Sequence, residues 1–304
     1  MKTWVIGAGG LFGSALARIS KETYIASSIP WNDTTEALAA LESALAEFTA
    51  SCSTDWCIFW AAGYATTSST QAEADRELSL FTAFVDALRN NPPTGRGVFA
   101  LTSSAGGIYG GSSSPPFTSS TLPAPLGTYG NLKLAQETAA KKLNPEIPVL
   151  IARVGNIYGP GQDLTKLQGI VSHLALAAIT KKPVNIFVPL ETLRDYVYVD
   201  DAAQQALHWA AEALQTQNSA TRIIGSGRPE TLGRIIALMS DITRTRIPIA
   251  SGFDASATHQ TIDLRLVPDS DNLTKRLHIT QLPDGMRRVY LDIAARHTEA
   301  ALTS

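Results

Sequence analysis

The sequence predicts an α/β fold: a doubly wound parallel sheet with helices on both faces, joined to a smaller C-terminal lobe. Three observations lead to this prediction. Short apolar runs typical of strands alternate with longer amphipathic runs typical of helices as far as residue 154, a pattern characteristic of parallel sheets. A glycine-rich turn separates the first strand from the first helix. Beyond Gly155, proline and glycine break the pattern, which indicates a second lobe.

The elements of the first half follow one another regularly. Strands are expected at residues 3–8, 23–26, 56–62, 97–102 and 149–154. Helices are expected at residues 11–20, 34–49, 73–90 and 129–143. Asn32 or Asp33 can cap the second helix, and Asn91-Pro92-Pro93 ends the third. Residues 112–128 are dense in Ser, Pro and Thr and should form a loop. In the less regular second half, helices are expected near residues 164–180, 200–216 and 232–243.

The overall composition is that of an ordinary globular protein. With 304 residues, the chain can bury about three quarters of its unfolded surface. A formal net charge of −2, without a long run of one sign, gives no electrostatic reason to expect nucleic acid or a membrane as a partner. The apolar stretches fall short of the ~20 residues of a membrane span, and no charged leader precedes the first strand. We therefore expect a cytoplasmic protein.

Metal binding is not expected. Cys52 and Cys57 are the only cysteines, and no further cysteine or histidine lies near enough to complete a zinc site. Cys57 lies in an apolar run, which favours a core residue over a reactive thiol.

The glycine-rich turn is a candidate phosphate-binding site. Gly7, Gly10 and Gly13 recur at every third position between the first strand and the first helix. Glycine lets the backbone approach a pyrophosphate, and a helix N-terminus offers free N–H groups with a partial positive charge. Strand, glycine turn and helix in this order are typical of a Rossmann-type dinucleotide-binding domain.

Tyr129 and Lys133 are the candidate proton-transfer pair. They are four residues apart, so on a helix they lie one turn apart on the same face. A nearby ammonium stabilises the phenolate form of a tyrosine, which allows the side chain to exchange protons near neutral pH. No other tyrosine in the chain has a lysine at this spacing.

Four further motifs accompany the turn and this pair. They read Trp60-Ala61-Ala62-Gly63, Leu101-Thr102-Ser103-Ser104-Ala105-Gly106-Gly107-Ile108-Tyr109-Gly110, Arg153-Val154-Gly155-Asn156-Ile157-Tyr158-Gly159-Pro160-Gly161 and Arg194-Asp195-Tyr196-Val197-Tyr198-Val199-Asp200-Asp201. In order and spacing the set resembles the extended short-chain dehydrogenases/reductases, and among them the NAD-dependent epimerase/dehydratase family, with its UDP-galactose 4-epimerase-like members. The likeness runs from residue 3 to about residue 285.

The resemblance implies the catalytic roles. Tyr129 would act as general acid and base, and Lys133 would hydrogen-bond the nicotinamide ribose. A serine hydroxyl at the end of the fourth strand would polarise the substrate oxygen. Ser104 is preferred, but an ungapped fit places Ala105 at the usual serine position, so Ser103 stays an alternative.

The resemblance also implies the binding roles. Arg194 would grip the diphosphate of a nucleotide-sugar, a task suited to a bidentate guanidinium; alternatively it forms a salt bridge with Asp195 or Asp200. Asn156 would contact the substrate or order the strand end. The expected cofactor-binding residues are Gly7, Gly10, Leu11, Phe12, Gly13, Ser27, Ala61, Ala62 and Gly63, together with Tyr129 and Lys133. Residues 1–155, with a return segment at about 190–216, would form the dinucleotide-binding domain, and residues 156–189 and 217–304 the substrate-binding lobe.

The chain departs from the family pattern in three places. No acidic residue ends the second strand, where one would bind the ribose 2′-hydroxyl and favour NAD. Ser27 or Ser28 could instead hydrogen-bond a 2′-phosphate, but no arginine stands beside them, so the cofactor is NAD or NADP. A strand usual in the family is missing, and Asp33 is either its remnant or, as we prefer, a helix cap. Gln260 occupies the place of a second phosphate-binding arginine, with Arg265 as a displaced substitute.

Two functions of different classes follow from these observations. The first is an NAD(P)-dependent epimerase or reductase acting on a sugar-like alcohol or ketone, with or without an attached nucleotide. The second is a non-catalytic NAD(P)-sensing binding protein of the same fold. Dehydration is disfavoured, because the 4,6-dehydratases that resemble this fold use an Asp-Glu pair near the serine position, where this chain has Ser104-Ala105 and no carboxylate. A homodimer is expected because relatives pair helices equivalent to residues 73–90 and 129–143, although core packing explains their apolar stripes equally well.

Overall fold

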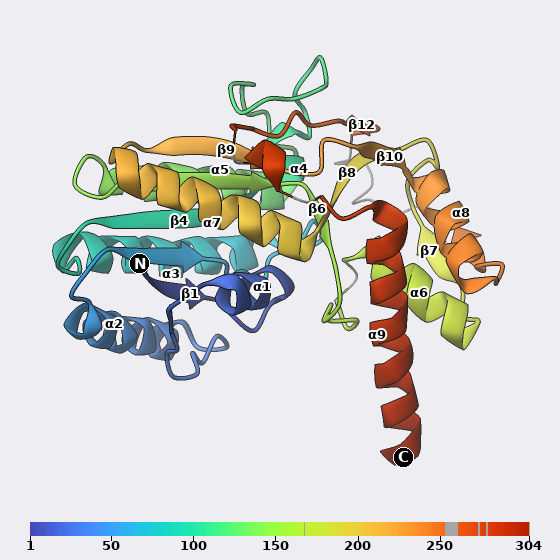
Figure 1. The fold of residues 1–304 in the computed structure, drawn as a ribbon, viewed down its shortest axis with the longest axis horizontal. Coiled ribbons are helices and arrows are strands. Elements are labelled where there is room, and N and C mark those ends of the chain that lie inside the picture. The colour runs from blue at the N-terminus through green and yellow to red at the C-terminus, as the bar shows by residue number, and fades with distance from the viewer. Residues whose placement is uncertain (167, 253–260, 273, 278, 304) are drawn as a thin grey trace.

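A parallel sheet of six strands, with helices on both faces, forms the larger part of the molecule (Figure 1). The computed structural model describes residues 1–304 except 167, 253–260, 273, 278 and 304. The strand order is β2-β1-β3-β4-β5-β9, and it confirms the predicted doubly wound sheet of Rossmann type. The strands are β1 (Lys2–Ile6), β2 (Thr23–Tyr24), β3 (Trp56–Trp60), β4 (Gly97–Ser104), β5 (Val149–Val154) and β9 (Ala220–Ile224).

Each face of this sheet has its own hydrophobic core. On one face the strands pack against α2 (Thr34–Ser51), α3 (Gln71–Asn90) and α5 (Gly127–Ala140). On the other face they pack against α1 (Leu11–Ile19) and α7 (Val199–Thr216). Successive strand side chains point to opposite faces, and β3 is buried along its whole length. This explains why the central strands read as continuous apolar runs rather than alternating ones.

The second lobe is built around a small mixed sheet. Its central strand is β8 (Leu193–Tyr198); β6 (Asn156–Tyr158) and β12 (Asp263–Leu264) run parallel to β8, and β10 (Pro229–Thr231) runs antiparallel. A second pair joins β7 (Val184–Ile186) and β11 (Ile249–Ser251). A separate hydrophobic core packs this lobe, and α9 extends along it to the C-terminus (Figure 1). The helices are α6 (Ile170–Thr180), α8 (Leu232–Thr243) and α9 (Leu282–Thr303).

The chain crosses between the lobes at different residues from those predicted. The expected return segment at 190–216 includes β8, which belongs to the second sheet. The expected lobe segment 217–304 includes β9, which pairs in parallel with β5 in the main sheet. The return to the main sheet is therefore α7 and β9. Only Ile223 and Ile224 are fully buried in β9, so its sequence shows no periodic strand signal.

Most other predicted elements lie within a few residues of the observed ones. The helix expected at 164–180 begins only at Ile170, because Gly169 precedes it with a positive φ of 93°. The short helix α4 (Ala105–Tyr109) and the long helix α9 were not predicted. Among the described residues, no helix combines the length and apolarity that crossing a membrane requires. The apolar stripes of α3 and α5 face the core, so the homodimer stays a prediction.

Replacing Phe84 by alanine should strongly destabilise the protein. Phe84 is fully buried on α3, with its ring centroid 5.7 Å from that of Trp4 and 5.2 Å from that of Trp60. Removing a buried phenylalanine ring costs roughly 3–5 kcal/mol, which should lower the midpoint of urea unfolding. Arg89→Ala, on an exposed part of the same helix, should change the free energy of unfolding by less than about 0.5 kcal/mol. Equal unfolding midpoints for the two variants would show that this aromatic cluster contributes little to the stability of the protein.

Candidate functional site

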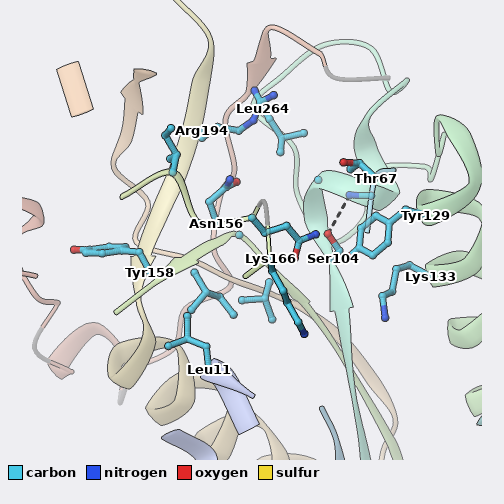
Figure 2. A pocket seen from close by; sticks show the side chains of 18 of the residues that line it. Leu11, Thr67, Ser104, Tyr129, Lys133, Asn156, Tyr158, Lys166, Arg194 and Leu264 are labelled. Atoms are coloured by element: carbon cyan, nitrogen blue, oxygen red, sulfur yellow. Dashed lines mark hydrogen bonds between the residues drawn. The ribbon is translucent and has the colours of Figure 1, made fainter. Parts of the chain in front are cut away.

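A cavity of about 610 Å³ lies where the two lobes meet. Residues that follow β1, β3, β4 and β5 line it, so it lies at the carboxyl edge of the main sheet. The strand order reverses between β1 and β3, and such a switch point is where open α/β sheets bind ligands. From the second lobe, β8, the segment before α6, and β7 with the residues that follow it contribute to the wall (Figure 2).

The glycine turn after β1 has no room for side chains. Gly7 has a φ of 92°, and a Cβ on it would lie 2.5 Å from the backbone nitrogen of Ala62. A Cβ on Gly13 would collide with the carbonyl of Gly7. Gly10 precedes α1 and provides no side-chain cap. The N–H groups of the first turn of α1 therefore stay available to an anion. These are the features that a dinucleotide pyrophosphate requires.

The predicted cofactor-binding residues lie on both sides of this turn. Leu11 and Phe12, in the first turn of α1, line the cavity, as do Ala61, Ala62 and Gly63 after β3. Ser27 is exposed and lies outside the cavity lining. Its role at the ribose end therefore stays a prediction.

Tyr129 and Lys133 lie one turn apart near the start of α5, and both line the cavity. The Lys133 Nζ is 5.7 Å from the centroid of the Tyr129 ring. Two glycines let the helix approach α4: a Cβ on Gly107 would lie 3.1 Å from the Tyr129 ring, and one on Gly130 would collide with the carbonyl of Gly107. The close approach brings the tyrosine beside the end of β4.

The two candidate serines differ in what their hydroxyls contact. Ser103 is buried and donates a hydrogen bond of 2.6 Å to Glu137. Ser104 caps α4, accepting the N–H of Gly107 at 3.1 Å, and lies beside the tyrosine in the cavity (Figure 2). Its own proton can therefore still be donated to a ligand. Ala105 is fully buried. This geometry favours Ser104 and gives Ser103 a supporting place.

A buried ion pair lies behind the serines. Arg153 donates from Nε and Nη2 to both oxygens of Glu137, at 2.9 and 2.6 Å, and from Nη1 to the Tyr109 hydroxyl at 2.7 Å. Burial raises the pKa of Tyr109, and its hydroxyl donates to the Thr118 carbonyl at 2.9 Å. With the bond from Ser103, this network fixes α5 against β4 and β5.

Lys133 has a buried network of its own, which sequence reasoning missed. Its Nζ donates to Gln136 at 2.9 Å and lies 3.6 Å from the Glu77 carboxylate. One signal could have revealed Glu77, because it interrupts the apolar stripe of α3 between Ala74 and Phe81.

Arg194 faces the cavity from β8 and is 9% exposed. Its Nη1 donates to the carbonyls of Leu193 and Ile262, at 2.8 and 3.5 Å. It forms no salt bridge within the part of the chain that the structure describes. Burial lowers the pKa of its guanidinium, and the negative charge of Asp263, which forms no salt bridge with it, offsets this only in part. A desolvated cation without a directly paired counter-ion is costly. An anionic ligand would relieve that cost.

The acidic residues beside Arg194 in the sequence bind elsewhere. Asp195 is fully buried and accepts the N–H groups of Ser226 and Gly227, each at 2.7 Å. Asp200 forms a salt bridge with Arg18. The alternative in which Arg194 pairs with either aspartate is therefore wrong.

Other polar side chains complete the cavity wall. Asn156 begins β6, Lys166 precedes α6, and both reach the cavity (Figure 2). Thr192 is buried in the lining, and its hydroxyl has no hydrogen-bond partner among the described residues. Within that part of the chain, no aspartate or glutamate lines the cavity. Nor do three or more His, Cys, Asp or Glu side chains gather there as a metal site.

Neither Gln260 nor Arg265, the residues expected at the second phosphate-binding position, is found among the described residues that line the cavity. Gln260 lies outside the described residues. Arg265 forms a bidentate pair with Asp263, with Nη2 to Oδ2 at 2.8 Å, and it does not line the cavity.

Comparisons with known proteins agree with this arrangement. The NAD dependent epimerase/dehydratase family pattern matches residues 3–224. The dTDP-L-rhamnose 4-epimerase of Burkholderia thailandensis is 36% identical over 123 residues, covering 38% of this chain and 33% of that protein. The dTDP-4-dehydro-6-deoxyglucose reductase of Escherichia coli is 32% identical over 140 residues, covering 45% and 43%. The matched segments thus span less than half of either relative.

Solved structures share the fold over the whole chain. UDP-glucose 4-epimerase from Thermotoga maritima, in a crystal structure with UDP-glucose, has a TM-score of 0.75 at 19% identity, covering 98% of this chain and all of that one. At this identity the likeness concerns the fold alone. The family pattern covers most of the chain and confirms the resemblance seen in its motifs. The chain belongs to the NAD-dependent epimerase/dehydratase family.

Proposed function

We propose that this protein is an NAD(P)-dependent epimerase or reductase that interconverts an alcohol and a ketone on a nucleotide-linked sugar. One observation carries the proposal. A single cavity contains Tyr129, Lys133 and Ser104 beside the glycine turn, and it contains the unpaired Arg194 on the opposite wall. The first group of residues suits proton transfer, and the arginine suits a diphosphate.

The residues around the glycine turn would hold the cofactor. Leu11 and Phe12 would offer backbone N–H groups to the pyrophosphate. The N–H of Gly10 donates to the carbonyl of Gly7 within the turn, and Gly7 and Gly13 keep the turn close to the sheet. Ala61–Gly63 and Lys133 would contact its nicotinamide half. When bound, the cofactor accepts or supplies a hydride.

The proton moves at the substrate oxygen. Tyr129 would take the hydroxyl proton when the alcohol is oxidised and return it when the ketone is reduced. The Ser104 hydroxyl would hydrogen-bond the same oxygen as its charge changes. The ammonium of Lys133 stabilises the negative charge on the tyrosine oxygen.

The charges of the cavity favour a nucleoside-diphosphate sugar. Arg194 and Lys166 are cations on the substrate side, and the described lining contains no carboxylate. A neutral sugar would leave both cations uncompensated, whereas a diphosphate pairs with them. The named activities of the relatives on dTDP-sugars support the same class.

Native mass spectrometry of the purified protein separates epimerase from reductase. An epimerase regenerates its cofactor in every turnover and should retain NAD or NADP. A reductase exchanges its cofactor and should be purified empty. The retained or preferred dinucleotide also decides between NAD and NADP. If the protein binds neither NAD nor NADP, both the epimerase and the reductase hypotheses are wrong.

Tyr129→Phe should abolish turnover without loss of cofactor binding. The substitution removes the proton-transferring hydroxyl and keeps the ring that packs near Gly107. Turnover of UDP- or dTDP-sugars should fall by roughly 10²–10⁴-fold, while the Kd for the dinucleotide, measured by fluorescence, stays within about twofold. Turnover that survives in this variant would exclude Tyr129 as the acid and base. If the wild type turns over no sugar in a broad panel but binds dinucleotide, the sensing protein becomes the better reading.

Arg194→Ala should weaken binding of the nucleotide-sugar. Loss of charge-assisted hydrogen bonds costs about 1.5–3 kcal/mol, so the Kd for UDP-glucose or dTDP-glucose measured by calorimetry should rise at least tenfold. Arg89→Ala is the matched control, because that guanidinium is exposed on α3 and does not line the cavity. An unchanged Kd for the nucleotide-sugar in Arg194→Ala would show that this arginine does not bind the diphosphate.

A further inference from the structure

Glu77 is a buried carboxylate directed at the ammonium of Lys133. It lies on α3, and its side chain is 5% exposed, against 9% for Lys133. The Glu77 Oε1 lies 3.6 Å from the Lys133 Nζ. Gln136, fully buried, bridges them: it accepts from Lys133 at 2.9 Å and donates to Glu77 at 3.1 Å. Lysine, glutamine and glutamate thus form one closed chain of contacts.

The other oxygen of Glu77 holds the loop that follows β3. Oε2 accepts the backbone N–H groups of Tyr64 and Ala65, each at 2.9 Å. This loop comes directly after Ala61–Gly63, which lines the cavity on the cofactor side. A Cβ on Gly63 would lie 3.0 Å from Glu77 Oε1, so the loop closes tightly over the carboxylate. Glu77 therefore connects Lys133 with the cofactor-side wall.

Stability alone does not account for a charged pair at this position. A buried ion pair is often no more stabilising than apolar side chains of the same volume. The surrounding residues of α3, including Phe81 and Phe84, are apolar. What the charged pair provides, and an apolar pair would not, is a fixed direction for the ammonium and a counter-charge beside it.

We propose that Glu77 is a positioning residue that fixes the Lys133 ammonium through Gln136, ties it to the cofactor-side loop and offsets part of its charge. The proposal rests on the proposed function, in which Lys133 serves the cofactor and Tyr129. Glu77 itself does not line the cavity, so it would act through Lys133. Without it, Lys133 would be drawn less firmly toward α3 and would act on the tyrosine with its full charge.

The direction of the effect on pH dependence follows from the charges around α5. Tyr129 and Glu137 lie on α5 itself, Arg153 on β5 and Glu77 on α3. Glu137 and Arg153 neutralise each other, so Glu77 is the carboxylate that offsets Lys133. Removing its charge should favour the tyrosine phenolate. In the direction of alcohol oxidation, the acid limb of the rate profile should move to lower pH.

The test uses two variants: the first removes the negative charge from position 77, and the second places it at position 136, the other side of the hydrogen bond between the two side chains. Glu77→Gln removes the carboxylate but keeps an oxygen for the N–H groups of Tyr64 and Ala65. Adding Gln136→Glu returns a carboxylate within reach of Lys133, with the donor and acceptor of the bridge reversed. Asp75→Asn is the matched control, because it removes a carboxylate from an exposed part of α3. The dinucleotide Kd, the Tm and the pH profile of turnover are measured for each.

Glu77→Gln should raise the dinucleotide Kd by roughly tenfold and move the acid limb of the pH profile to lower pH. The double variant should restore both to within about threefold and a few tenths of a pH unit of the wild type. Asp75→Asn should change neither. An unchanged Kd and pH profile in Glu77→Gln would overturn the proposal. So would a double variant with the wild-type Tm that restores nothing.

A second measurement decides the matter if the double variant does not fold. Glu77→Gln and Lys133→Gln are combined, and dinucleotide binding is measured for both single variants and the pair. Fold-changes that multiply independently would show that the two side chains do not act together, whereas strong non-additivity supports the proposal. Binding needs no turnover, so these results stand even if no sugar is converted. That outcome would count against the proposed function alone.

Discussion

Two buried ion pairs hold helix α5, and the candidate site depends on them. Lys133 pairs with Glu77 of α3, and Glu137, one turn further along α5, pairs with Arg153 of β5. Burying a charge is costly unless it is paired and hydrogen-bonded, so each pair has few acceptable arrangements. Together they fix the rotation of α5 about its axis and its height above the sheet. Tyr129 lies on the first turn of this helix and is placed by the same contacts.

The same pairing leaves the cavity positively charged. Glu77 and Glu137 lie behind the residues that line it, and Asp195 and Asp200 are bound by backbone N–H groups and by Arg18. Arg194 forms no salt bridge among the described residues, although Asp195 and Asp200 follow it closely in the sequence. A site arranged in this way attracts an anion, and burial strengthens the attraction because screening by water is weak there.

Much of the main lobe could be predicted, because its signals are local. The alternation of apolar runs marks β1, β3, β4 and β5, and the glycine spacing marks the turn that precedes α1. The second lobe could not be read in this way. Strands such as β6, β10 and β12 span two or three residues, too few for a period to appear. β9 is longer, but only its last two residues are buried, so it gave no apolar run, and its place in the main sheet is decided by pairing with β5.

Local patterns along the chain were enough to predict the doubly wound sheet, the glycine turn and the one-turn spacing of Tyr129 and Lys133, since each depends on residues only a few positions apart. The tertiary structure was needed to show which serine hydroxyl is bound to a carboxylate, which carboxylate accompanies Lys133 and whether Arg194 forms a salt bridge. Those three outcomes depend on contacts between segments distant in the sequence: Ser103 with Glu137, Lys133 with Glu77, and Asp195 with Ser226. Such contacts are set by how helices and strands pack against one another, and no local spacing records that packing.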